Sequence, residues 1–130
     1  MSRPLCLFTL ALCACHPGTS MPAPNPIDAS PIACRLDALN PAQRTREAEL
    51  LKELRRVVVE TREEPDGYSF RCPNDPAAFS KVAELVSLEH RCCPFLNFSL
   101  EWPGGDAAPW LHVTGGARIK PFVESTFGGG

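Results

Sequence analysis

Two adjacent cysteines, Cys92 and Cys93, follow Glu89 and His90 at the end of a stretch with helical periodicity. Thiolates bind soft metal ions and attack disulfides, and a carboxylate three or four residues earlier on a helix can accept a thiol proton. Pro94 disfavours helical geometry at Cys93, so the helix should end at the cysteine pair. Because the negative end of a helix opposes a thiolate, this position favours metal capture over a low-pKa redox nucleophile.

The two other cysteines of the expected folded region, Cys34 and Cys72, differ in their distance from this pair. Cys72 precedes the helix that ends at Cys92, and about sixteen residues at 1.5 Å each separate them by roughly 24 Å. Cys72 therefore lies outside the site unless a homodimer brings it in. A ferredoxin-like arrangement places Cys34 near the end of the helix. The sequence predicts a metal site of Cys34, Cys92 and Cys93, with His90 as a candidate fourth ligand.

The identity of the expected ion follows from the spacing of the thiols. Zinc sites prefer cysteines two to four residues apart, and no C-x-x-C occurs among the four cysteines of the folded region. Soft, low-coordinate ions such as Cu(I), Hg(II) or trivalent arsenic tolerate adjacent thiolates better. The prediction is thus a small binding protein for a soft metal ion.

Two other functions fit the same residues. In a thiol-disulfide or thiol-transfer enzyme, Cys92 or Cys93 would attack, the other would resolve, and Glu89 would accept a proton. In a structural or interaction module, the cysteines would only pack, because free cysteines behave as small buried hydrophobes. The surface that meets the partner would then contain Phe95, Phe98 and Trp102.

The elements that must position these residues follow from hydrophobic periodicity and turn residues. The expected order is β-α-β-β-α-β-β-α, with strands near 32–36, 57–62, 68–72, 98–102 and 110–114 and helices near 41–56, 76–91 and 117–127. Asn40-Pro41 and Asp75-Pro76 are typical helix starts. The simplest packing is an α+β domain with helices on one face of a mainly antiparallel sheet, similar to the ferredoxin-like fold with one added strand.

Composition places this single domain in the later part of the 130-residue chain. Only Arg3 and Asp28 of the 28 charged residues (13 basic and 15 acidic) fall in the first thirty positions, whereas six of the 14 prolines lie at or before Pro31. The folded region is therefore expected over residues 32–127, with a glycine tail at 128–130. A net charge of -2 and the lack of a Lys/Arg run argue against a nucleic-acid partner.

The N-terminal residues have the pattern of a targeting signal. Arg3 precedes an uncharged run from Leu5 to Ala14, which is too short to span a bilayer but long enough for a signal-peptide core. Residues 12–15, Leu-Cys-Ala-Cys, resemble a bacterial lipoprotein cleavage box. This resemblance implies a signal segment at 1–15, a lipidated Cys15, a proline-rich tether at 16–31 and attachment to a membrane of the cell envelope. The alternative is a mis-assigned start and a cytoplasmic domain.

A longer pattern runs through the folded region. E-x-x-C-C-P-F at Glu89 to Phe95, an alternating aromatic strand and W-L-x-V-T-G at Trp110 to Gly115 together resemble small uncharacterised bacterial proteins that carry this motif. The resemblance covers about residues 32–127. It implies that Glu89, Cys92 and Cys93 are the residues to test, and it implies no particular reaction.

Overall fold

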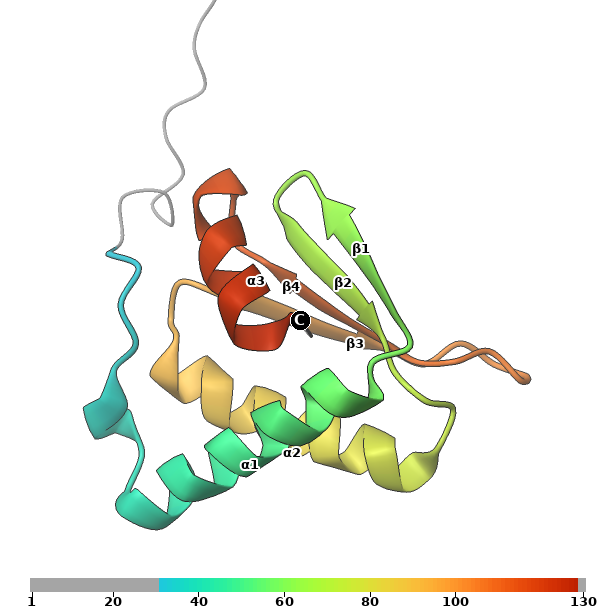
Figure 1. Ribbon diagram of the computed structural model, residues 1–130, viewed down its shortest axis with the longest axis horizontal. Coiled ribbons are helices and arrows are strands. Elements are labelled where there is room, and N and C mark those ends of the chain that lie inside the picture. The colour runs from blue at the N-terminus through green and yellow to red at the C-terminus, as the bar shows by residue number, and fades with distance from the viewer. Residues whose placement is uncertain (1–30, 129–130) are drawn as a thin grey trace, which may run out of the picture.

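The computed structural model describes residues 31–128, in which two pairs of strands lie between three α-helices along the chain (Figure 1). The α-helices are α1 (Pro41–Val57), α2 (Pro76–Cys92) and α3 (Lys120–Phe127), and the strands are β1 (Glu60–Glu64), β2 (Gly67–Arg71), β3 (Asn97–Glu101) and β4 (Trp110–Thr114). Two short 3-10 helices, η2 (Leu36–Ala38) and η3 (Ala117–Ile119), complete these elements. The expected signal segment, Cys15 and the tether up to residue 30 lie outside the described residues.

The four strands form one antiparallel sheet in the order β1-β2-β4-β3. β1 and β2 make a hairpin in which Glu64 pairs with Gly67, so Pro65 and Asp66 form the turn between the two strands. A Cβ atom on Gly67 would lie 2.0 Å from the carbonyl oxygen of Val113, so only glycine fits this close approach of β2 to β4. The predicted class, an α+β domain with a mainly antiparallel sheet, is confirmed.

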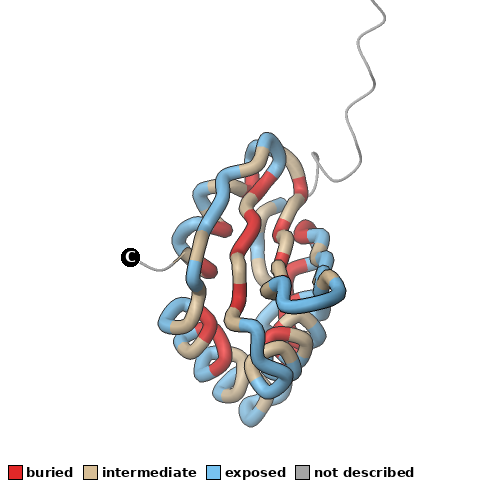
Figure 2. Tube along the Cα trace, turned by 90° about the vertical axis from the view of Figure 1, so that its right-hand side faces the viewer, coloured by how far each residue is buried: buried red, intermediate tan, exposed pale blue. Residues whose placement is uncertain are grey.

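The helices cover one face of the sheet and bury a common core. Figure 1 shows α1 and α2 side by side and α3 lying across the sheet, and Figure 2 shows buried residues along the strands and along the inward sides of the helices. Phe127 of α3 packs between Phe70 of β2 and Phe98 of β3, with ring centroids 6.2 Å apart in both pairs. Other core side chains are Leu50, Leu54, Val82, Leu85, Leu111, Val113 and Val123.

The strand predicted at 32–36 is not formed, and this part of the prediction is wrong. Ile32 and Cys34 are half-buried between exposed neighbours, so the alternation is real, but the segment lies against the end of α2 instead of joining the sheet. The Arg35 amide donates to the Cys92 carbonyl oxygen at 2.7 Å. Leu36, expected on the buried face, is 61 % exposed at the start of η2. The observed order of helices and strands is therefore α-β-β-α-β-β-α, which only broadly follows the ferredoxin-like pattern.

Both long helices begin as the sequence predicts. Asn40 accepts a hydrogen bond from the Gln43 amide, and the Gln43 side chain accepts one from the Asn40 amide, which completes a capping box at the start of α1. The Asp75 carboxylate accepts a hydrogen bond from the Ala78 amide at the start of α2. The second helix ends at Cys92, just before Pro94, and Cys93 is its C-cap. The cysteine pair thus closes the helix.

The other face of the sheet carries a polar network. Ser69 donates to Glu64 Oε1 at 2.9 Å, and its oxygen lies 2.7 Å from His112 Nδ1. His112 Nε2 lies 3.4 Å from Glu101. Because Ser69 gives its single proton to Glu64, the imidazole Nδ1 proton is directed to the serine oxygen. Although a serine beside a histidine suggests a nucleophile, Ser69 is 1 % exposed, and its network with Glu64, His112 and Glu101 joins all four strands.

Candidate metal centre

The candidate site forms where α2 ends and the segment before η2 passes beside it. The hydrogen bond from the Arg35 amide to the Cys92 carbonyl holds these two parts of the chain together. The Cys93 amide donates to the Glu89 carbonyl oxygen at 2.7 Å, which caps the last turn of α2. These two backbone contacts fix the positions of Cys34, Cys92 and Cys93 relative to one another.

Three thiols converge at this point. The sulfur atoms of Cys34 and Cys93 lie 2.9 Å apart, and the sulfur atoms of Cys34, Cys92 and Cys93 all lie within 4.8 Å of one another. Cys34 is half-buried, whereas Cys92 and Cys93 are buried. The structure therefore brings together the three cysteines that the sequence selects, although Cys34 arrives on an irregular segment instead of a strand. Such a group of sulfur ligands can hold a metal ion.

Glu89 lies beside the thiols and is 1 % exposed. Its Oε2 accepts a hydrogen bond from the Cys93 thiol at 3.3 Å, while Oε1 is buried and has no partner among residues 31–128. Burial, and then the neighbouring Glu47, raise the pKa of Glu89 to about 8, against a smaller lowering by Cys93. The raised pKa favours the protonated form of this carboxyl group at neutral pH.

The thiols are also held in their neutral forms. Burial, and then the proximity of Cys34, raise the pKa of Cys92 to about 11. Burial raises the pKa of Cys93 further, and the contacts with Cys34 and Glu89 act in the same direction. The C-terminal end of α2 adds a partial negative charge at the same place. Without a bound cation, the raised pKa values therefore favour thiols over thiolates at this site.

His90, the candidate fourth ligand, is not part of the three-thiol group. It is exposed and lines a surface groove with Val86, Leu96, Asn97 and Phe98. Arg91 does not serve as a counter-ion for the sulfurs, because its guanidinium donates to the Ala38 carbonyl oxygen at 2.9 Å. The ligands of the group are therefore sulfur atoms only.

Cys72 lies apart from the cluster, as the length of α2 predicts. It follows β2, is buried, and its thiol is 3.8 Å from the Phe70 carbonyl oxygen. Burial raises its pKa to about 11. Cys72 is thus a core residue and a suitable control for experiments on the other three cysteines.

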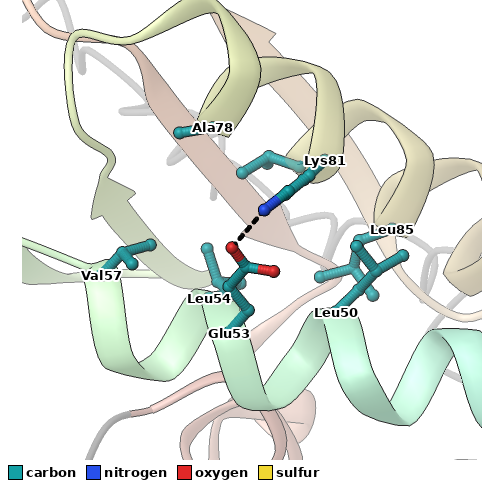
Figure 3. A pocket seen from close by; sticks show the side chains of 8 residues that line it. Leu50, Glu53, Leu54, Val57, Ala78, Lys81 and Leu85 are labelled. Atoms are coloured by element: carbon teal, nitrogen blue, oxygen red, sulfur yellow. Dashed lines mark hydrogen bonds and ion pairs between the residues drawn. The ribbon is translucent and has the colours of Figure 1, made fainter.

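A second concave feature lies between α1 and α2 (Figure 3). Leu50, Leu54 and Leu85 line it, and Lys81 donates to Glu53 across its mouth at 2.5 Å. The volume of this pocket is about 30 Å³, which is too small for an organic substrate, and none of the cluster cysteines line it. The pocket is a packing defect between two helices joined by an exposed ion pair.

The fold and the cluster together define a small α+β domain with a three-thiol centre at a helix C-terminus. Comparison with protein-family models, curated proteins and solved structures finds no match to the chain. Among residues 31–128, no helix has the length and apolar character needed to cross a membrane.

Proposed function

We propose that this protein captures a soft metal ion, Cu(I), Hg(II) or an ion of similar preference, through Cys34, Cys92 and Cys93. The observation that carries the proposal is the convergence of three sulfur atoms within 4.8 Å of one another. Thiolates favour soft ions, and a structural zinc site would need a fourth protein ligand that this group does not contain. A centre with three sulfur ligands suits soft ions of low coordination number, such as Cu(I) and Hg(II).

Burial of the cluster supports capture over catalysis. A thiol-transfer enzyme needs an accessible thiolate at neutral pH, whereas Cys92 and Cys93 are buried and their pKa values are raised. A bound metal ion deprotonates a coordinating thiol directly and needs no prior thiolate. The same features that weaken a nucleophile are therefore compatible with a metal ligand.

As part of the same proposal, lipidated Cys15 would anchor the protein to a membrane of the cell envelope. The support is the lipoprotein-like Leu-Cys-Ala-Cys at residues 12–15. Intact-mass analysis and detergent-phase partitioning of the chain expressed in a bacterium test this part. A water-soluble product without added lipid mass would exclude the anchor and leave the metal centre unaffected.

The metal proposal is tested by anaerobic titration of the reduced chain with Cu(I) against a competing chelator. Cys6, Cys13 and Cys15 should be replaced by serine in the reference chain, because these thiols lie outside the described domain and would bind copper independently. We expect one Cu(I) per chain, bound tightly enough to compete with the chelator. Failure of the reference chain to take up Cu(I) and Hg(II) would refute the proposal.

The apparent Cu(I) affinity should rise with pH. Cys92 and Cys93 bind as thiolates but carry protons at neutral pH, since burial raises the pKa of Cys92 to about 11 and raises that of Cys93 as well. Release of at least these two protons predicts an increase of at least about 100-fold in the association constant per pH unit between about pH 6 and pH 8. Competition titrations at several pH values measure the slope. A flat profile would show that other groups hold the ion.

A further inference from the structure

The contact between Cys34 and Cys93 has a second chemical use. Their sulfur atoms are 2.9 Å apart, closer than a metal site alone requires, although the residues are 59 positions apart in the chain. The hydrogen bond from the Arg35 amide to the Cys92 carbonyl keeps the two segments adjacent. We propose that Cys34 and Cys93 form a reversible disulfide that closes the metal centre under oxidising conditions. Its effect on metal uptake rests on the proposed function, but formation of the bond does not.

The different exposure of the two thiols sets the order of events. Cys34 is half-buried, so a low-molecular-weight disulfide reaches it first, whereas Cys93 is fully buried beside it. The Cys34 sulfur attacks one sulfur of the oxidant, whose S–S bond breaks, and the leaving thiolate takes up the Cys34 proton. The Cys93 sulfur then attacks the mixed disulfide at Cys34, and the second leaving thiolate takes up the Cys93 proton. Two protein thiols are oxidised to one disulfide, and one external disulfide is reduced to two thiols.

The competing product is a disulfide between the adjacent Cys92 and Cys93. That bond closes an eight-membered ring and distorts the peptide between the two residues, so it is strained and easily reduced. Cys34 and Cys93 meet across two separate segments and form no such ring.

Closing this bond removes two of the three sulfur ligands. Cys92 is then the one cysteine of the cluster with a free thiol, and a single buried thiol is a poor site for Cu(I). The reduced centre would therefore bind metal, and the oxidised centre would not. The sulfur atoms of Cys34 and Cys93 would be metal ligands in the first state and a disulfide in the second.

Peptide mapping of the full chain tests the bond. The reduced chain is incubated with glutathione disulfide, free thiols are blocked with N-ethylmaleimide, and the protein is cut before each aspartate without reduction. Because Asp28, Asp37, Asp75 and Asp106 bound the relevant fragments, Cys34 is isolated in 28–36 and the adjacent pair in 75–105. We expect these fragments to be cross-linked in the parent and in Cys92→Ser, and separate in Cys93→Ser. An internal disulfide in 75–105, or a link from 28–36 to the cysteines of 1–27, would overturn the proposal.

Metal uptake by the same samples tests closure. We expect oxidation to weaken Cu(I) binding by at least about 100-fold, and reduction by a phosphine to restore it. If the cross-linked protein binds Cu(I) as tightly as the reduced protein, closure is refuted. If the link forms but the reduced protein binds no copper, the proposed function fails while the disulfide stands. If copper binds but no link forms, the switch fails and the metal centre stands.

Discussion

Replacing both Cys92 and Cys93 by serine should weaken Cu(I) binding by at least about 1,000-fold, which corresponds to roughly 4 kcal/mol. The double variant keeps the backbone contacts at the end of α2 but loses two of the three sulfur ligands. Serine offers a hard hydroxyl oxygen, which a soft ion binds poorly. Competition titration in the background without Cys6, Cys13 and Cys15 measures the change.

Cys72→Ala is the matched control for this variant. Cys72 is equally buried but lies outside the cluster, so its loss should leave the copper affinity unchanged. Circular dichroism must show that both variants fold. Equal affinity in the double serine variant and the parent would exclude the pair as ligands. Cys34→Ser then separates two-coordinate from three-coordinate binding, since only the latter requires this residue.

The second large effect concerns Glu89 and the stability of the metal-free domain. The pKa of Glu89 is raised from 4.5 to about 8 in the folded state, mainly by burial. The folded protein therefore holds a proton that the unfolded chain releases once the pH exceeds about 4.5. The contribution of Glu89 to the free energy of unfolding is greatest below that value and falls as the pH rises toward 8, by on the order of 4 kcal/mol at about 1.4 kcal/mol per pKa unit.

Glu89→Gln should remove most of this decline, because glutamine stays neutral in both states. The free energy of unfolding is measured in urea at a series of pH values, with reductant and a metal chelator present. Glu84→Gln on the same helix is the control, since Glu84 is exposed and its pKa is lowered by Arg46. Parallel pH profiles for the parent and Glu89→Gln would show that this carboxyl group does not control the pH dependence.

The parts of the fold that sequence predicts well depend on neighbouring residues. The caps at Asn40 and Asp75, the turn at Pro65 and the end of α2 before Pro94 are all set by side chains within a few positions. The segment from Ile32 to Leu36 has a strand-like alternation, but alternation does not specify which surface the buried side chains meet. The backbone of this segment forms a hydrogen bond with the end of α2, so the segment does not join the sheet as the predicted strand.

The candidate site shows the same division. Glu89 and Cys92 are three residues apart on α2 and share one side of the helix, whereas His90 is rotated by about 100° and faces solvent. Proximity along the sequence does not distinguish His90 from Glu89 and Cys92. The rotation of about 100° per residue in a helix does distinguish them, and it could have been used to exclude His90 from the sequence alone. Glu47, by contrast, influences Glu89 from α1 through the packing of two helices. No local pattern distinguishes it from the other charged residues of α1.

The separation of Cys34 and Cys93 along the chain has a mechanical consequence. A bond between them, through metal or sulfur, would close a ring that contains α1, β1, β2 and α2 and leaves β3, β4 and α3 outside it. A ring spanning 59 positions restricts the unfolded chain by about 4 kcal/mol of lost conformational entropy. A metal ion or a disulfide at these sulfur atoms would thus raise the thermal stability of more than half of the domain.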